Sequence, residues 1–510
     1  MTTRFHAMKP GYFLRTFLLP FVILIIGTDG ATAQTYDIVV RGGRVMDPET
    51  GFDKIANVGI SGQTILAITE SDLKGRKVID ARGLVVAPGF IDLHAHGQTN
   101  LENSLQVQDG VTTALELEIG KYPVDHFYDV REGKALINYG HSVSHIWGRA
   151  DALYPDEHML ENPGPILVRA AHHSAEEDDR QNILSSMESS LAQGAIGIGF
   201  GIEYTPAVGR EEVYRIFQLA AKHGAPVFVH PRRGREGDPA SGSNLQQMQE
   251  VIANAAATGV GLHICHLPSS AIQDTAITLE LIDEARAHGV DVTTEAYPYT
   301  AGSTILISAL FDAGWRERLG GVDYSDVVWT ATGERLTEKT FHAYRKHAME
   351  TDDPANVIIH FVPEDAMRMA INHPDVIIAS DGMTIRNNNE HPRGTGTYAR
   401  VLGRFVREEG AMSMMAALRK MTILPAQRLE SYAPAMRNKG RVKVGADADL
   451  TLIDPKRVID RATYKDPMVP SDGFPYVLVN GVVVVENGTL QEGVFPGKAI
   501  KGKGLAVLAQ

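Results

Sequence analysis

The stretch PGFIDLHAH, residues 88–96, decides how the rest of the chain is interpreted. It is typical of a short apolar β-strand whose end carries two histidines, His94 and His96. Side chains two residues apart on a strand project to the same side, as two ligands of one metal ion must. Because such a histidine pair also occurs without metal, its meaning depends on how the other strands end.

Between Val86 and about Tyr432, β-type runs alternate with helical patterns. One helical face carries Val213, Ile216 and Phe217, and Gly224 follows it as a stop. Eight strands are expected: GFIDLHAH (89–96), VTTALELE (111–118), 139–146, AIGIGFGI (195–202), PVFVH (226–230), GLHICH (261–266), DVTTEAY (291–297) and DVIIASD (375–381). This rhythm predicts an α/β fold with a (β/α)₈ TIM-like barrel over residues 88–435, and a doubly wound open sheet is the alternative.

Short β-type runs also flank the barrel on both sides. Residues 35–87 and 436–510 each contain several, and the later segment has an Asn480-Gly481 hairpin signal. They predict a small β-sandwich built from both termini. The segment 303–356, between the seventh and eighth barrel strands, is long for a crossover, and we expect a lid over the barrel mouth.

Residues 1–34 form a separate segment that is typical of an export signal. Arg4, Lys9 and Arg15 precede the apolar run Phe17 to Ile26, and Ala31-Thr32-Ala33 gives a cleavage site. The run is about half the length of a spanning helix, so we expect cleavage and a secreted or periplasmic protein without a stable membrane anchor. Cleavage removes three basic residues and Asp29, and changes the net charge from −13 to −15.

The composition narrows the class of protein further. A net charge of −13 argues against a nucleic-acid partner, because nucleic-acid binders carry a basic face. Cys265 is the only cysteine, so no intrachain disulfide can form. Because Cys265 adjoins His266 on a strand, we expect its thiol to be inert and to point toward the helices.

Three other candidate barrel strands end on metal-binding residue types. His230 ends the fifth strand, His266 the sixth and Asp381 the eighth. In a barrel these side chains would converge with His94 and His96 at one mouth. Imidazole with carboxylate favours Zn²⁺, in one or two copies, and other divalent transition metals fit the same donors.

These residues carry a resemblance to a known family. PGFIDLHAH, the histidines after VFV and HIC, ASDG (379–382) and GADADLTLID (445–454) resemble the amidohydrolase superfamily. AYPYTAGST (296–304), HPRGTGTYARVLG (391–403) and MTILPAQRL (421–429) are similar to N-acyl-D-amino-acid deacylases. LHAHGQ with ALELEIG looks like the N-acyl-D-glutamate deacylase branch. The resemblance implies that a metal-activated water cuts an amide bond, with Asp381 carrying the proton and a free D-amino acid as product.

The chain departs from that family at one position. Deacylases of this kind often have a metal-bridging cysteine after the second strand, where this chain has ELEIG. Glu118 would replace the thiolate by a carboxylate, with Glu116 as the alternative. A carboxylated lysine on the fourth strand, which many amidohydrolases use as the bridge, is excluded because no lysine lies between Lys134 and Lys222.

Arginines beside the expected ligands indicate a small anionic substrate. Arg232, Arg233 and Arg235 follow His230, and Arg393 lies in a glycine-flanked loop after Asp381. Guanidinium groups bind carboxylates with two parallel hydrogen bonds. The resemblance makes Arg393 the first choice for the substrate carboxylate and places Tyr204, Tyr297 and Ser303 around the pocket.

Other readings stay open from the sequence alone. A dipeptidase, a cyclic-amide hydrolase and a periplasmic metal-binding protein without turnover are the rival functions. His141 and His145 either line the mouth or belong to the core. The sequence does not decide the acyl group, the substrate side chain, the number of metal ions or the oligomeric state.

Overall fold

The structure is a computed structural model that describes residues 34–157, 163–233, 244–351, 356–386 and 389–504. Residues 1–33 of the expected export signal lie outside the described residues, and Gln34 is the first described residue. Arg235 also lies outside the described residues. Within the described residues, no helix combines the length and the apolar character needed to cross a bilayer.

Eight parallel strands form the barrel, in chain order, as the sequence predicts. Neighbours in the sheet are consecutive barrel strands throughout. The strands are β6 (Phe90–Asp92), β7 (Val111–Lys121), β8 (Asn138–Ser144), β9 (Ile198–Gly201), β10 (Val227–His230), β11 (Leu262–Ile264), β12 (Val292–Ala296) and β17 (Val376–Ile378). A bridge between Ala95 and Gly382 joins the segments that follow β6 and β17, so the barrel is nearly closed.

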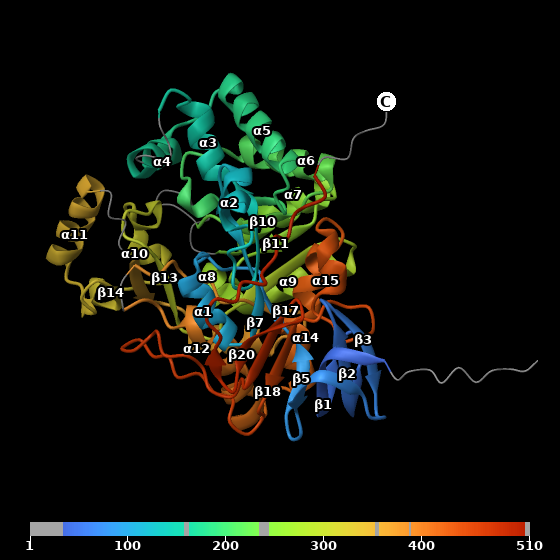
Figure 1. Cartoon of the computed structure of the whole chain (residues 1–510). Coiled ribbons are helices and arrows are strands. Elements are labelled where there is room, and N and C mark those ends of the chain that lie inside the picture. Colours follow the sequence, from blue (N-terminus) through green and yellow to red (C-terminus); the bar gives the residue numbers. More distant parts are fainter. Residues whose placement is uncertain (1–33, 158–162, 234–243, 352–355, 387–388, 505–510) are drawn as a thin grey trace, which may run out of the picture.

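Amphipathic helices cover the barrel. In α6 (Arg210–His223), the predicted apolar face is buried, and Gly224 ends the helix with φ of 60°. A residue with a Cβ is disfavoured in this left-handed conformation, which explains the stop signal. The helices α3 (His145–Leu153), α5 (Glu177–Ala192) and α6 lie together on one side of the barrel (Figure 1).

A nine-stranded sheet joins the two ends of the chain, as predicted. β5 (Val85–Pro88) pairs antiparallel with β18 (Leu450–Ile453), which places Val86 opposite Leu452. The remaining strands are β1 (Thr35–Asp47), β2 (Phe52–Ser61), β3 (Thr64–Thr69), β4 (Lys74–Asp80), β19 (Tyr476–Val479), β20 (Val482–Glu486) and β21 (Thr489–Leu490). The Asn480-Gly481 hairpin connects β19 to β20, and both residues have positive φ.

The end of the described chain leaves this sheet and packs on the barrel. The Tyr139 N–H at the start of β8 donates to the Lys498 carbonyl, and the Ile500 N–H donates to the Tyr139 carbonyl. The C-terminal segment therefore contacts the end of the barrel opposite the strand carboxyl ends.

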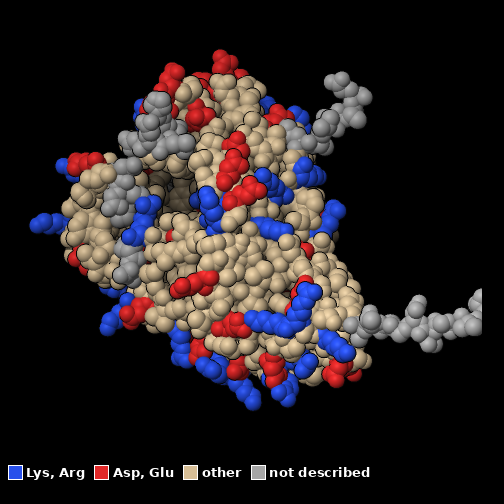
Figure 2. All heavy atoms as spheres, viewed as in Figure 1, with Lys and Arg blue, Asp and Glu red and all other residues tan. Residues whose placement is uncertain are grey.

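The expected insertion forms a small unit of its own. Its antiparallel sheet contains β13 (Ala301–Ile305), β14 (Val327–Trp329), β15 (Glu334–Arg335) and β16 (Asn356–His360). The helices α10 (Trp315–Arg318) and α11 (Glu338–Thr351) accompany it on one flank of the barrel (Figure 1). Phe311, Trp315 and Phe341 form the centre of its apolar core, and Tyr204 packs against that core from the barrel side. Figure 2 shows a hollow beside this unit, on a face where positive and negative side chains are interspersed.

Candidate metal centre

The two histidines that follow β6 present their Nε2 atoms to the same point. The Nε2 atoms of His94 and His96 lie 3.2 Å apart, and the His94 side chain is 1% exposed. Each ring contacts a carboxylate through its Nδ1 atom: His94 contacts Glu295, and His96 contacts Glu116. A carboxylate on Nδ1 fixes the tautomer that leaves Nε2 free to ligate a metal.

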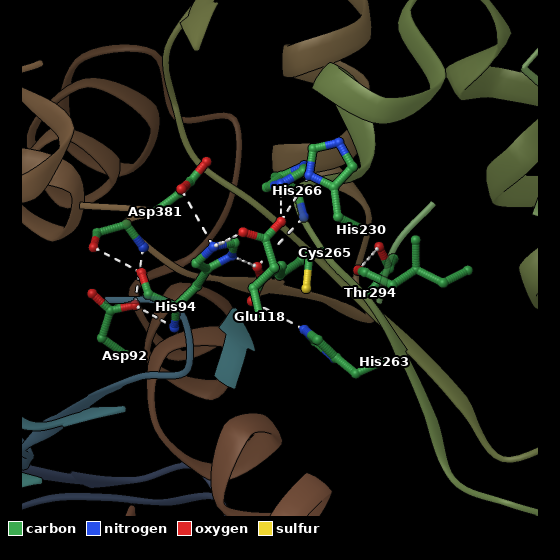
Figure 3. A network of polar contacts seen from close by, with 12 residues as sticks. Asp92, His94, Glu118, His230, His263, Cys265, His266, Thr294 and Asp381 are labelled. Atoms are coloured by element: carbon green, nitrogen blue, oxygen red, sulfur yellow. Dashed lines mark hydrogen bonds and ion pairs between the residues drawn. The ribbon is translucent and has the colours of Figure 1, made fainter. Parts of the chain in front are cut away.

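Glu118 from β7 lies between His94 on one side and His230 with His266 on the other (Figure 3). Its Oε2 atom is 3.2 Å from His94 Nε2 and 3.4 Å from His96 Nε2. Its Oε1 atom is 2.8 Å from both His230 Nδ1 and His266 Nε2. The two oxygens of one carboxylate therefore face two separate sets of imidazole nitrogens, which is the arrangement of a ligand that bridges two cations.

Asp381 completes the set at the end of β17. Its Oδ1 atom is 3.3 Å from the Nε2 atoms of both His94 and His96. Asp381 and His266 have positive φ, 52° and 31°, and such backbone strain costs about 1–3 kcal/mol per residue. The surrounding structure maintains this strain at two side chains that point into the cluster.

Glu116, the alternative bridging residue, has a different place. Its Oε2 is 2.7 Å from His96 Nδ1, on the side of the ring away from Glu118. Glu295 was not among the predicted site residues, yet it contacts His94 and also lies 3.0 Å from His263 Nε2. A lone carboxylate in the otherwise uncharged strand VTTEA (292–296) was the signal that pointed to it.

The electrostatics of the cluster favour a divalent cation. Burial acts to raise the pKa of Glu118, but the charges of His94 and His266 with hydrogen bonds from His230 and His266 hold it well below its usual range. Burial also disfavours charge on His94, yet Asp381, Glu118 and Glu295 raise its pKa well above normal. The triads His94/His96/Glu118 and Glu118/His230/His266 each bring three ligand atoms within 4.8 Å of one another.

The donor set fits transition metals. His230 Nε2 is buried and has no hydrogen-bond partner among the described residues, while His266 Nδ1 faces the hydroxyls of Ser269 and Ser270 at 2.9 and 3.1 Å. Four imidazoles with two carboxylates match the ligands that zinc and its neighbours prefer, and calcium or magnesium would require mostly oxygen. All six predicted ligands are therefore together, and each could hold metal.

Arg393 reaches the cluster, but its guanidinium is already in contact with protein groups and is not free to bind an anion alone. Its Nη1 lies 2.9 Å from Asp381 Oδ2, and Nη2 donates to the Ser303 carbonyl. The guanidinium carbon is 4.6 Å from the centre of the Tyr297 ring. Burial opposes ionisation of Asp381, and the Arg393 charge helps to lower the pKa of Asp381 below its usual value.

The other predicted substrate contacts divide into two groups. Tyr204 and Tyr297 are at the cluster: the Tyr204 ring centre is 4.7 Å from that of His230, and Tyr297 packs at 6.4 Å from His266. Ser303 contributes its carbonyl, because its hydroxyl donates to Val357. Arg232 is directed elsewhere, toward the Val208 carbonyl and Glu250.

The expected orientation of Cys265 is wrong. The thiol lies inside the barrel and forms a cluster of potential ligand atoms with His94 and Glu295 (Figure 3). Cys265 and His266 are adjacent yet both face the interior. Strand alternation does not apply to this pair, because β11 ends at Ile264 and His266 adopts a left-handed conformation. Burial raises the pKa of the thiol well above normal, which agrees with an inert group.

His141 and His145 belong to the core and do not line the barrel mouth. His141 packs against the rings of Phe127 and Tyr128, with ring centres 4.6 Å apart in each case. His145 is buried 2.9 Å from Glu212, which also binds Arg149. Neither histidine contacts the six predicted ligands in the described structure.

Fold and site together define the class: a (β/α)₈ barrel with a candidate two-metal centre at the carboxyl ends of its strands. The sequence model of the amidohydrolase family matches residues 77–181 and 145–485. The chain belongs to this family.

Named relatives are similar over almost the whole chain. An N-acyl-D-glutamate deacylase from Alcaligenes xylosoxydans xylosoxydans is 31% identical, covering 88% of this chain and 94% of the relative. A D-aminoacylase from the same organism is 29% identical, covering 91% and 97%. The crystal structure of an N-acyl-D-glutamate deacylase from Bordetella bronchiseptica, with zinc and a phosphonate inhibitor, superposes with a TM-score of 0.76 at 25% identity, covering 92% of this chain and all of the other.

Proposed function

We propose that this protein is a metal-dependent deacylase that hydrolyses the amide bond of N-acyl-D-amino acids to a carboxylic acid and a free D-amino acid. The observation that carries the proposal is the position of Glu118, with one oxygen toward His94 and His96 and the other toward His230 and His266. The similarity to a deacylase of N-acyl-D-glutamate supports that acid as a substrate. Zinc is the proposed metal, since it is present in the Bordetella relative.

The six ligands would hold one or two ions at the strand ends. When bound, the metal lowers the pKa of a water molecule and polarises the amide carbonyl. Asp381 Oδ1 lies within 3.3 Å of both His94 Nε2 and His96 Nε2, so its carboxylate borders the place where the amide must lie. Because Arg393 keeps Asp381 ionised, Asp381 can accept a proton at neutral pH and pass it to the leaving amine.

Stereochemistry needs a further anchor besides the amide itself. The scissile carbonyl lies at the ligand cluster and the leaving nitrogen within reach of Asp381, so the position of the carboxylate decides which enantiomer fits. Arg393 contacts Asp381 directly, which places its guanidinium one short step from the leaving nitrogen. We assign the α-carboxylate to Arg393 on this ground.

The test is a substrate panel on zinc-reconstituted protein. N-acetyl and longer-acyl derivatives of D- and L-leucine, methionine, glutamate and aspartate are incubated with enzyme, and the released amine is measured. We expect turnover of D-substrates only, lost on chelation and restored by zinc. Turnover of L-substrates alone would overturn the stereochemical part of the proposal.

Three rivals are tested by the same preparation. A cyclic-amide hydrolase is disfavoured because β9 has the sequence IGFG, without a lysine to bridge metals, and Glu118 lies between the two histidine pairs. Release of ring-opened product from hydantoin or dihydrouracil would support that rival, and cleavage of unblocked dipeptides would support a dipeptidase. Stoichiometric zinc without turnover of any substrate would support a binding protein.

We also propose that the protein is exported, on the strength of the basic start, short apolar run and small-residue cleavage site in residues 1–34.

A further inference from the structure

Arg233 is a second buried arginine at the edge of the candidate metal centre. It follows His230 by three residues and is 3% exposed. Its Nη2 donates to the Ser269 carbonyl, and its backbone N–H donates to Glu203 Oε2. Among the described residues, its Nε and Nη1 have no hydrogen-bond partner, and Glu203 Oε1 is 3.7 Å from Nη1. A buried cation with unused donors is costly unless another molecule supplies the acceptors.

The guanidinium is close to the ligands on the far side of Glu118. Ser269, whose carbonyl accepts from Arg233, also places its hydroxyl 2.9 Å from His266 Nδ1. Arg233 therefore belongs to the same polar site as His230 and His266.

Arg233 and Arg393 both lie against aromatic rings that meet at Gly302. The Arg233 guanidinium carbon is 6.0 Å from the Phe361 ring centre, and that of Arg393 is 4.6 Å from the Tyr297 ring centre. A Cβ placed on Gly302 would lie 2.9 Å from the Phe361 ring and 3.5 Å from the Tyr297 hydroxyl. The absence of a side chain at Gly302 lets both rings approach its backbone, so the two guanidinium groups stand on rings that meet at one residue.

We propose that Arg233 is a second anchor for the substrate's α-carboxylate, which binds between Arg233 and Arg393. The inference rests on the proposed function and deepens it. Each guanidinium faces one carboxylate, at 2.9 Å for Arg393 and Asp381 and at 3.7 Å for Arg233 and Glu203, so Arg233 is the more loosely paired of the two. Arg233 provides two unused N–H donors, and a carboxylate there satisfies them.

The test separates carboxylate recognition from general damage. Acetate release from N-acetyl-D-leucine is compared with that from N-acetyl-D-leucinamide, which lacks the charge, for Arg233→Met, Arg233→Lys and the control Arg232→Met. We expect Arg233→Met to lower kcat/KM for the acid by about tenfold to a hundredfold, mainly through KM, with a much smaller change for the amide. Arg233→Lys should recover part of the loss, and Arg232→Met should leave the acid-to-amide ratio unchanged, because Arg232 is held by Glu250.

Zinc content is measured for every variant, since Ser269 connects Arg233 to His266. Equal losses for acid and amide at full zinc content would overturn the assignment. A loss confined to N-acetyl-D-glutamate, absent with N-acetyl-D-glutamine and N-acetyl-D-leucine, would also overturn it, because Arg233 would then bind the side chain.

Binding of the acid and of the amide to zinc-free protein is also measured by calorimetry, for wild type and for Arg233→Met. Binding does not require turnover, so this measurement tests the second anchor independently of the proposed function. If wild-type enzyme hydrolyses none of the N-acyl-D-amino acids of the panel, the proposed function fails. A wild-type preference for the acid that disappears in Arg233→Met would still support the second anchor, and its persistence in that variant would overturn it.

Discussion

Replacement of Glu118 tests the centre most directly, because this one carboxylate contacts all four imidazoles. Glu118→Gln keeps the shape but removes the charge and turns an amide NH₂ toward one histidine pair. The side chain is 1% exposed, and its oxygens lie 2.8–3.4 Å from the four histidines. Removal of one partner from a buried charged cluster costs about 3–5 kcal/mol, which corresponds to a loss of roughly two to three and a half orders of magnitude in zinc affinity.

Glu116→Gln is the matched control, since among the four histidine ligands Glu116 contacts only His96, through its outer nitrogen. Changes to partners of that kind cost about tenfold to a hundredfold in metal affinity. Zinc affinity is measured by competition with a chromophoric chelator, zinc content by atomic absorption, and kcat/KM on the same samples. Glu118→Cys, which supplies the thiolate expected from relatives, should retain more zinc than Glu118→Ala.

A larger zinc loss in Glu116→Gln than in Glu118→Gln would move the bridging role two residues earlier. Retention of two zinc ions and normal turnover in Glu118→Gln would exclude a bridging role for Glu118.

Four further changes have defined outcomes. Asp381→Asn should lower kcat/KM by about 10²- to 10⁴-fold with at least one zinc ion retained, measured by amine release and metal analysis. Arg393→Lys should lower kcat/KM by about tenfold to a hundredfold at unchanged zinc content, since lysine keeps the charge and loses the fork. Arg393→Met should also move the acid limb of the pH–rate profile to higher pH, because Arg393 lowers the pKa of Asp381 and the base must be ionised. Cys265→Ala should keep zinc stoichiometry and kcat within about twofold, and a large loss would assign the thiol a role at His94. N-terminal sequencing of exported protein should give a start near Gln34, and an intact Met1 would contradict export with cleavage.

The sequence predicted the barrel well because strand periodicity, helix faces and glycine stops agreed over each unit. The place of His94, His96, His230, His266 and Asp381 followed from one rule, that strand ends converge at one face of a barrel. The sequence could not choose between Glu116 and Glu118, because residues two apart on a regular strand share a side. A register irregularity in β7 between Glu116 and Lys121 accompanies their different places: Glu116 contacts the outer nitrogen of His96, and Glu118 lies between the two histidine pairs.

The errors came from backbone that departs from regular strand geometry. Cys265 faces the barrel interior on the same side as His263, since both side chains lie at Glu295. His266 joins them through a positive φ, which no propensity rule predicts. The contact of Arg393 with Asp381 fits their short separation in sequence. Arg232 pairs with Glu250 because of where α7 (Leu245–Thr258) packs. The residues next to Arg232 in the sequence do not predict that packing.

The buried carboxylates indicate how much positive charge the centre is built to hold. Glu116, Glu118, Glu295 and Asp381 contact the imidazoles, and Asp92 accepts a hydrogen bond from the His94 backbone while burial raises its pKa to about 6. At neutral pH, two divalent ions with Arg393 balance these five acidic groups, whereas one ion leaves an excess of negative charge that opposes an anionic substrate. The same excess raises the pKa of His94 and His96, so protons and metal compete for these rings and metal affinity must rise with pH. The carboxylates behind the ligands thus set the charge of the centre as well as the orientation of its histidines.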